Sequence, residues 1–304
     1  MAGTGTPFSG RSIPGGPVVI TDRSFTTGNV YFVHSSGTTT GGYSFSAPIT
    51  TLLGAVALCT ASQGDTIIVM EGHAETIATA TAMVIATAGI RVIGLGYGTN
   101  RPTFTFSATD SICSITAANV WVENIRLVSD IDNVVTGIDL GASADGCTLK
   151  NVELVDGASN KEFLIHVNIA TGCHDVTLDG VRVCGLGGGA TACVKFVGTS
   201  DRLVMKNCNM QGTFSAALVD ASAGILLNQQ INDNILHNRD TSAGLVYKGN
   251  SSSTGFLVRN QVLGAKNNTE TISTVTAMHC SLNYGTDVAA STAILTPSTL
   301  TAWT

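Results

Sequence analysis

The sequence predicts an all-β fold, a single-stranded parallel β-helix with about 27 residues per coil and an N-terminal capping helix. Two observations predict the coil: a strand-like motif recurs between Asn119 and Leu263, and a second strand-like run recurs in step with it. Each copy of the motif ends at an anchor residue, and the anchors are Asn124, Asn151, Gly180, Asn207, Asn234 and Asn260. Their spacings of 27, 29, 27, 27 and 26 residues are typical of a solenoid.

The motif itself alternates apolar and polar residues at period two, as in residues 120–124 (VWVEN), which predicts a strand. The second run, for example residues 138–140 (IDL), has the same character. Two or three short strands per repeat, without a helical segment between them, indicate a parallel β-helix. Equivalent residues then stack about 4.8 Å apart along the axis. Gly94, 30 residues before Asn124, indicates an earlier coil.

The charges around the anchors alternate from one repeat to the next. The residues that precede the anchors are Glu123, Lys150, Asp179, Lys206, Asp233 and Arg259. Two residues after the anchors, Arg126, Glu153 and Arg182 alternate as well. Stacked neighbours attract when their charges are opposite and repel when they are alike. We therefore expect two solvent-facing charge ladders that help to fix the register of the coils.

The anchor row predicts an asparagine ladder at a bend of the coil. Its members are Asn124, Asn151, Asn207, Asn234 and Asn260. Asparagine tolerates left-handed backbone and bonds to neighbouring backbone groups. Gly180 meets the same backbone demand.

Composition bounds the function classes. The net charge of −6 argues against binding to nucleic acid or to an anionic membrane. The sequence has no run of about 20 apolar residues, so no membrane span is predicted. The N-terminus lacks the regions of a signal peptide, so synthesis in a cytoplasm is expected. The eight cysteines form no CxxC pair and are expected to be reduced core residues. The histidines show no ligand spacing, so no metal and no cofactor is predicted.

The chain divides into four predicted segments. Residues 1–44 are a Gly-, Thr- and Pro-rich extended arm, either a disordered tail or a segment that becomes ordered on a partner, which is the favoured interpretation. Residues 45–64 hold the capping helix, predicted over 46–60 with Ser46 as its cap. The β-helix covers 65–265, and residues 266–304 form a C-terminal cap or a subunit contact.

Three stretches carry a family resemblance: residues 64–76 (GDTIIVMEGHAET), 89–98 (GIRVIGLGYG) and 100–104 (NRPTF). In this order, after a cap helix and before the Asn-ended coils, they resemble the first turns of the pectate-lyase-like right-handed β-helix superfamily. The GHAET form is similar to β-helix proteins of tailed bacteriophages, which are commonly virion components. The resemblance covers roughly residues 45–265 and implies a right-handed coil. It implies less about function, because this fold hosts lyases, hydrolases, spikes and structural proteins.

Polysaccharide lyases and hydrolases need carboxylates that converge on one groove, or acids that bind Ca²⁺ beside a basic residue. The acids outside the ladders are Glu71, Glu75, Asp130, Asp132 and Asp175. Of these, Asp130, Asp132 and Asp175 are weak catalytic candidates, and no catalytic residue is assigned.

Three further features invite a functional interpretation. Trp121 is predicted to face outward, where a subunit contact is the simplest role. His166 is predicted to face outward, because it alternates with Ile165 and Val167. The glycine-rich stretches 94–98 and 185–189 lead into no helix, which excludes a phosphate site of the helix N-terminal kind.

The leading functional hypothesis is a non-enzymatic bacteriophage virion protein. It would be assembled in the host cytoplasm as a homotrimer and would decorate the head surface. Its N-terminal arm would attach it to the major capsid protein or to other virion proteins. The alternative is a tail spike or fibre that binds or depolymerises host-surface glycan. A cellular carbohydrate-active β-helix enzyme is a weaker third hypothesis, because a signal peptide is missing.

Overall fold

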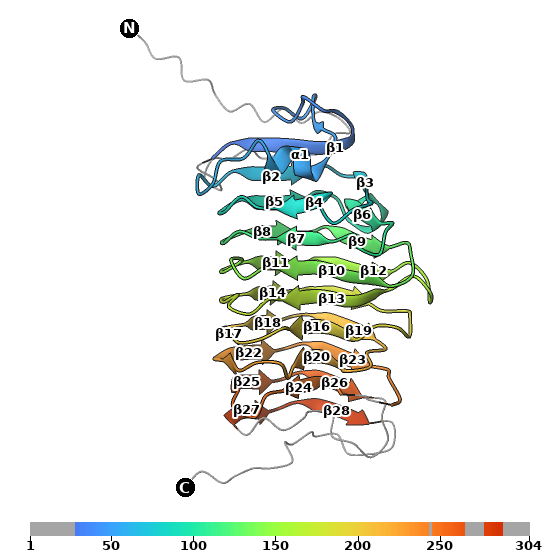
Figure 1. The fold of residues 1–304 in the computed structure, drawn as a ribbon, viewed down its shortest axis with the longest axis vertical. Coiled ribbons are helices and arrows are strands. Elements are labelled where there is room, and N and C mark those ends of the chain that lie inside the picture. Colours follow the sequence, from blue (N-terminus) through green and yellow to red (C-terminus); the bar gives the residue numbers. More distant parts are fainter. Residues whose placement is uncertain (1–27, 243–244, 265–276, 288–304) are drawn as a thin grey trace.

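The computed structural model describes residues 28–242, 245–264 and 277–287. In this part the chain is an all-β parallel β-solenoid of about seven turns, with about 27 residues per coil (Figure 1). All strand pairs in the three large sheets are parallel, for example β11 (Thr148–Lys150) with β8 (Trp121–Glu123) on one side and β14 (Thr177–Asp179) on the other. The prediction of an all-β parallel β-helix is confirmed. The right-handed sense stays a prediction.

Three sheets run along the axis. Among the described residues, sheet 1 has ten strands, which are β1 (Val30–Thr38), β2 (Thr66–Val69), β5 (Arg91–Gly94), β8, β11, β14, β18 (Val204–Lys206), β22 (Gln229–Asn232), β25 (Thr254–Val258) and β27 (Ala277–Ser281). Sheet 2 has nine described strands, which are β3 (Ala74–Ile77), β6 (Thr103–Phe106), β9 (Arg126–Ser129), β12 (Glu153–Asp156), β15 (Arg182–Cys184), β19 (Asn209–Gly212), β23 (Ile235–Asn238), β26 (Gln261–Gly264) and β28 (Tyr284–Asp287). Sheet 3 has seven described strands, which are β4 (Met83–Ile85), β7 (Cys113–Ile115), β10 (Val134–Leu140), β13 (Phe163–Ile169), β16 (Ala192–Phe196), β20 (Ala217–Ala221) and β24 (Tyr247–Gly249). Two shorter strands, β17 (Ser200–Asp201) and β21 (Leu226–Leu227), pair beside them.

Each full coil visits sheets 1, 2 and 3 in turn, as β8, β9 and β10 do. Alternation along each strand sends one set of side chains inward. On sheet 1 the inward column includes Val122, Leu149, Leu178 and Met205, all fully buried and in register. Such columns from the three sheets form one continuous apolar core along the axis.

The N-terminal helix is much shorter than predicted. The structure has α1 at Leu52–Val56, not a helix over 46–60. Its cap is Thr51, whose Oγ1 accepts a hydrogen bond from the Gly54 N–H at 3.1 Å, and not Ser46. Ile49, counted as part of the helical pattern, bridges to β1 instead and is extended. The predicted helix begins too early because the apolar side chain of Ile49 belongs to the strand edge and not to the helix.

The segment boundaries differ from the simple division of the chain. Strand β1 lies within the segment interpreted as an arm and pairs with β2 from Val30 to Val33. Strands β27 and β28 lie beyond residue 265 and continue sheets 1 and 2. Residues 1–27 of the arm and most of the C-terminal segment lie outside the described residues.

In the middle coils the anchor residues stack at one corner. Asn124, Asn151, Gly180 and Asn207 have left-handed backbone, with φ of 57°, 50°, 67° and 55°. The Asn124 side-chain amide donates to the carbonyl oxygens of Gly94 and Gly96, both at 2.8 Å. These anchors therefore occupy the bend between sheets 1 and 2 as the sequence suggested.

The row shifts by one residue in the coil that contains Asn234, which corrects the predicted ladder. Asn232 pairs with Lys206 and with Val258, so Asp233 and Arg259 take the left-handed corner position. Asn234 and Asn260 follow one position later and are buried. The register follows the inward apolar residues, because a one-residue slip would turn every side chain of the strand to the other face.

The shifted asparagines form a ladder inside the solenoid, which continues to Asn283. Asn234 Nδ2 donates to Asn260 Oδ1 at 2.9 Å, and Asn260 Nδ2 donates to Asn283 Oδ1 at 3.0 Å. The Asn260 oxygen also accepts from the backbone N–H of Asn234, at 3.0 Å. Asn260 Nδ2 donates in addition to the Ile231 carbonyl at 2.8 Å. Buried asparagines thus join three successive coils.

The first charge ladder extends over four coils and is then offset. Glu123 lies 3.4 Å from Lys150, and Asp179 lies 3.6 Å from Lys206. Lys206 then faces Asn232 instead of Asp233. The predicted last pair, Asp233 with Arg259, forms at 2.7 Å in the neighbouring column.

The second charge ladder centres on Glu153. Its carboxylate lies 2.7 Å from Arg126, 3.7 Å from Arg182 and 3.2 Å from Arg101. Trp121 lies beside the first ladder: its ring N–H donates to Glu123 at 2.9 Å, and the Lys150 ammonium lies 5.6 Å from the ring centre. Trp121 is half-buried by these contacts within its own chain.

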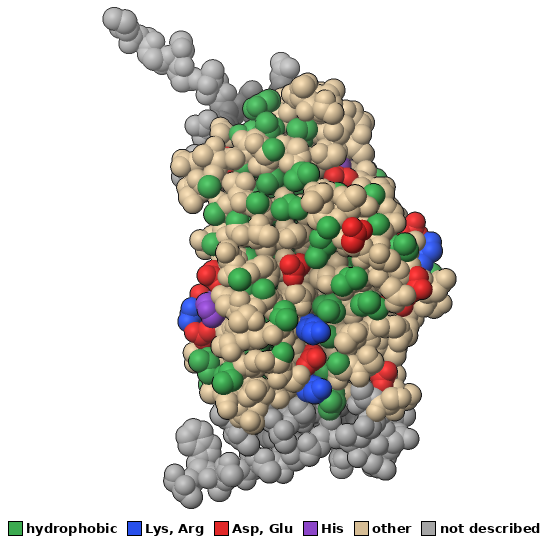
Figure 2. Space-filling view, in the orientation of Figure 1, with side chains coloured by type: hydrophobic (Ala, Val, Ile, Leu, Met, Phe, Trp, Pro, Cys, Tyr) green, Lys and Arg blue, Asp and Glu red, His purple; other side chains and the backbone are tan. Residues whose placement is uncertain are grey.

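A third polar column runs along sheet 3. Its stacked members are Asp139, Asn168, Lys195, Asp220 and Lys248. Asn168 donates to Asp139 at 2.7 Å. Figure 2 shows acidic and basic side chains among scattered apolar ones on the face turned to the viewer.

Candidate functional site

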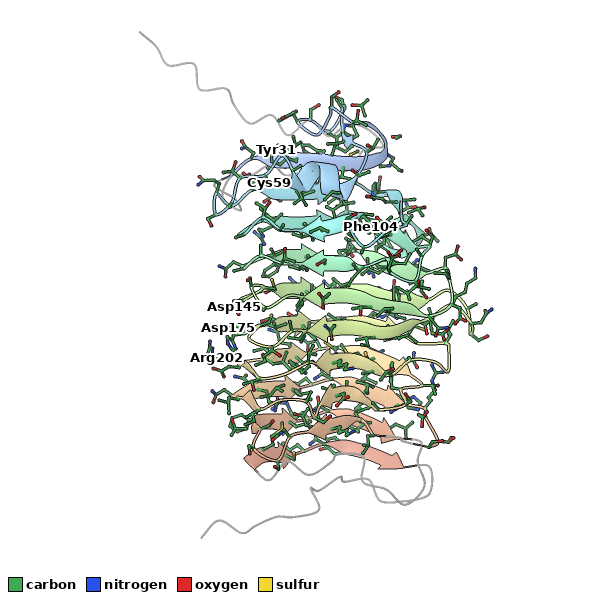
Figure 3. The ribbon with its side chains drawn as sticks, viewed as in Figure 1. Tyr31, Cys59, Phe104, Asp145, Asp175 and Arg202 are labelled. Atoms are coloured by element: carbon green, nitrogen blue, oxygen red, sulfur yellow. The ribbon has the colours of Figure 1, made fainter. Side chains whose placement is uncertain are left out.

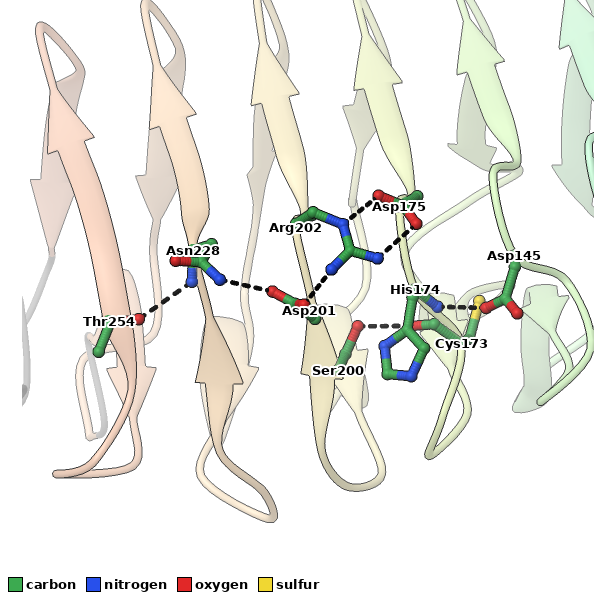
Figure 4. Close-up of polar contacts among 9 residues, drawn as sticks. All are labelled: Asp145, Cys173, His174, Asp175, Ser200, Asp201, Arg202, Asn228 and Thr254. Atoms are coloured by element: carbon green, nitrogen blue, oxygen red, sulfur yellow. Dashed lines mark hydrogen bonds and ion pairs between the residues drawn. The ribbon is translucent and has the colours of Figure 1, made fainter.

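Asp175, one of the three weak catalytic candidates, lies at the corner between sheets 3 and 1 (Figure 4). Its carboxylate accepts two hydrogen bonds from Arg202 of the next coil, at 2.5 and 2.7 Å. This hydrogen bonding holds the pKa of Asp175 below its ordinary value. Arg202 also pairs with Asp201. Asp175 is therefore an exposed, ionised partner of an arginine, which suits a clasp between coils better than proton transfer.

The same corner continues the contacts from coil to coil. The Asn228 side-chain amide donates to Asp201 at 2.9 Å, and the backbone N–H of His174 donates to Asp145 at 2.6 Å. In Figure 3 Asp145, Asp175 and Arg202 follow one another along one side of the solenoid. The acids of this corner are spread along the axis, each beside a donor, and do not converge on one point.

Asp130 and Asp132 lie on the loop between β9 and β10, and both are exposed. Asp130 pairs with Lys161 of the next coil at 2.6 Å. Glu71 is exposed. Glu75 accepts from the N–H of Leu52 at 2.9 Å and lies 3.1 Å from His73, so it fastens the start of α1.

A buried polar group lies under the glycine-rich loop 185–189, at the corner between sheets 2 and 3. Asp156, at the end of β12, is fully buried and lies 3.4 Å from His166 Nε2. The backbone N–H groups of Leu186 and Gly187 donate to Asp156 at 2.9 and 3.2 Å. Burial raises the pKa of Asp156, but the nearby ring of His166 and these N–H groups outweigh it, so the pKa lies below its ordinary value. Asp156 thus fixes the loop.

His166 corrects the prediction that it faces outward. It is fully buried, and its ring lies 5.5 Å from Phe163 and 5.7 Å from Phe214, both edge-on. His166 and Val167 are both buried, so the period-two alternation is interrupted within β13. The interruption places the ring of His166 in the core opposite Asp156. The alternation of apolar and polar residues along the sequence cannot reveal this burial.

Glu162 completes this group and was not singled out from the sequence. It lies directly before β13, is 4% exposed, and its Oε2 has no hydrogen-bond partner in the described structure. Burial raises its pKa above the ordinary value, and the negative charges of Asp132 and Asp156 raise it further. Asp132 therefore does approach another carboxyl group, but that group is Glu162 and not Asp130.

A groove of about 340 Å³ lies on the outer face of sheet 2. Its polar lining comes from four successive coils and includes Arg126, Glu153, Arg182, Asn209 and Gln211. Two guanidinium groups, a carboxylate and two amides can hydrogen-bond a hydroxylated or acidic ligand.

Among the described residues, no helix is long and apolar enough to cross a membrane. The described ranges also contain no group of three or more His, Cys, Asp or Glu side chains placed to hold a metal ion.

Comparison with known proteins gives a fold likeness and no family. No protein-family model matches the chain, and no curated protein sequence matches it. Among solved structures, a rhamnogalacturonan lyase is similar, with a TM-score of 0.42 and 9% sequence identity, over 84% of this chain and 87% of that one. The strand pairings establish the parallel β-helix by themselves. This distant likeness transfers no activity, substrate or residue role.

Proposed function

We propose that the chain is a non-enzymatic structural protein of a bacteriophage virion, a homotrimer on the head surface attached through its N-terminal arm. The observation that carries the non-enzymatic part is the ion pairing of two of the three weak catalytic candidates. Asp130 is neutralised by Lys161 and Asp175 by Arg202, in each case across successive coils. The outer charges thus hold the coils in register and are not gathered around a substrate.

The phage assignment is supported by the resemblance of residues 72–76 to β-helix proteins of tailed phages. In this structure the segment has a structural role, because buried His73 contacts Glu75, and Glu75 fastens α1. A solenoid locked by stacked pairs along its length suits a stiff surface component.

The proposal is tested by co-sedimentation of the purified chain with tailless heads of the source phage. Saturable binding to heads is expected, and deletion of residues 1–27, which leaves β1 in place, should abolish it. Full binding by the deletion variant would exclude the arm as the attachment segment, and absence of binding to heads would reject the head role. Light scattering at micromolar concentration should give the mass of a trimer, and a monomer would reject the trimer.

The groove on sheet 2 favours a second candidate, a spike or fibre protein that binds host-surface glycan. Arg182 is the most exposed of the basic residues that contact Glu153, with 62% of its side chain exposed. On this hypothesis Arg182→Ala should weaken binding to host cells or their polysaccharide at least tenfold. Arg259→Ala, away from this groove, should leave binding unchanged. A fall in polysaccharide viscosity that Asp130→Asn and Asp132→Asn abolish would make the protein a depolymerase.

A further inference from the structure

The glycine-rich loop 185–189 packs closely against the side chain of Glu162. Gly187 and Gly189 pass so close to its carboxyl group that a side chain at either would collide with it: a Cβ at Gly187 would lie 3.0 Å from Glu162 Oε2, and one at Gly189 would lie still closer to Oε1. The loop is fixed in this position by the N–H groups of Leu186 and Gly187, which bind Asp156. The loop backbone at Gly187 and Gly189, called here the glycine cradle, therefore lies directly against the carboxyl group of Glu162.

The charges around this carboxyl group are left unbalanced. Asp132, on the loop of the preceding coil, lies near enough for its negative charge to raise the pKa of Glu162 beyond the effect of burial. The nearest lysine in the sequence, Lys161, directs its ammonium group to Asp130 at 2.6 Å. Asp156 already accepts hydrogen bonds from backbone N–H groups and lies 3.4 Å from His166 Nε2. Among the ion pairs of the described residues, none includes Glu162 or Asp132. A buried carboxylate without a partner is unfavourable unless a proton or a cation binds it.

We propose that Glu162 and Asp132 form a binding site for one divalent cation, with Ca²⁺ as the ion that fits best. The site is not an acidic cluster alone, because Glu162 is 4% exposed and its Oε2 is directed into the cradle without a partner. The available donors are oxygens: two carboxylates and Asn133 Oδ1, which lies on the Gly189 side of the cradle, 3.6 Å from where a Cβ of Gly189 would be. Ca²⁺ takes six to eight oxygen ligands in flexible geometry, and backbone carbonyls and water complete the set.

Such an ion would join three coils at one corner. Asp132 belongs to the loop after β9, Glu162 to the loop after β12, and the glycine cradle to the loop after β15. The ion would neutralise the repulsion between the two carboxylates and hold the loops together. This inference does not depend on the head or spike role.

The test uses the full chain and Ca²⁺ alone as the probe. Titration calorimetry at neutral pH should show one saturable site per chain, and the thermal unfolding midpoint should rise by several degrees with excess Ca²⁺ over chelator. Asp132→Asn, a change at an exposed position, should weaken binding at least tenfold and remove the shift. Glu162→Gln should do the same. Asp130→Asn is the matched control on the same loop and should bind Ca²⁺ like the unchanged chain.

The Asp130→Asn control separates this site from weak surface binding. No saturable heat and no shift of the midpoint would overturn the proposal. Equal loss of binding in Asp130→Asn and Asp132→Asn would overturn it as well, because it would indicate diffuse attraction to the acidic loop.

Discussion

Asparagines follow the same strand motif in the middle and the C-terminal coils, yet they occupy opposite environments. Asn151 and Asn207 are exposed at the corner, with left-handed backbone. Asn234 and Asn260 are buried one position further along, in the column that holds Val152, Val181 and Cys208 in earlier coils. The outer asparagines supply left-handed backbone and bond to neighbouring groups such as the Gly94 carbonyl, whereas the inner asparagines hydrogen-bond one another between coils. The same residue type at the same spacing therefore has a different energetic role at the outer corner and in the interior of the solenoid.

The largest effect is expected from the inner ladder. Asn260→Ala removes the acceptor of Asn234 and the donor to Ile231 and Asn283. Because each buried hydrogen-bonding group left without a partner costs roughly 1–3 kcal/mol, the free energy of unfolding should fall by about 3 kcal/mol. Urea unfolding followed by circular dichroism measures this. Asn207→Gly is the outer control, and an equal loss in both variants would contradict the difference between the two rows.

A smaller effect should come from backbone strain at the outer corner. Asn151 has φ of 50°, where a β-branched residue is unfavourable. Asn151→Val should be about 1–2 kcal/mol less stable than Asn151→Gly, since left-handed backbone costs an L-residue that much. The two variants can be compared in one urea series. Equal stability would mean that the side chain, and not the backbone angle, explains asparagine at this corner.

The outer charge pairs should contribute least. Lys206→Gln removes the 3.6 Å contact with Asp179. The expected loss is below about 1 kcal/mol, because half-exposed pairs are weak in water. Unfolding at low salt and at about 0.5 M NaCl should show the loss shrinking as the charges are screened. A loss that persists at high salt would indicate packing by the lysine stem.

Acid should weaken the ion pair at the outer corner and leave the inner asparagine ladder unaffected. The hydrogen bond from Arg259 holds the pKa of Asp233 below its ordinary value. Its contribution is therefore complete above the unfolded pKa of about 3.9 and is lost as the pH falls through the lower folded value. The inner asparagines do not titrate. Asp233→Asn should flatten the dependence of unfolding free energy on pH below pH 4 or so, and Asn260→Ala should not. An unchanged slope in Asp233→Asn would show that the pair adds no stability.

Much of the fold could be predicted because a solenoid repeats its local rules. Alternation at period two identified strands such as β8, β11 and β14, and the common interval stacked them. The predicted helix is too long because Ile49 satisfies a helical spacing and a strand edge equally well. The sequence motif does not reveal the shift at Asn234, because the motif aligns the asparagines, whereas the inward residues Met205 and Ile231 decide the register.

Little of the polar group at the sheet 2–sheet 3 corner could be predicted. Asp156, Glu162 and residues 185–189 are separated along the chain and belong to different coils and loops. The sequence indicates Asp132 only as an acid outside the charge ladders and a weak catalytic candidate. Neither the burial of Glu162 nor the approach of the glycine loop leaves a periodic signal.

The sequence by itself determined the parallel coil, its length per turn and the charge alternation of the middle coils, because these depend on residues that recur at a constant interval. The tertiary structure decided which asparagines are inside, why His166 is buried and which carboxyl groups meet under the glycine loop. Those features depend on the exact stacking of successive coils, in which a shift of one residue exchanges the inner and outer faces.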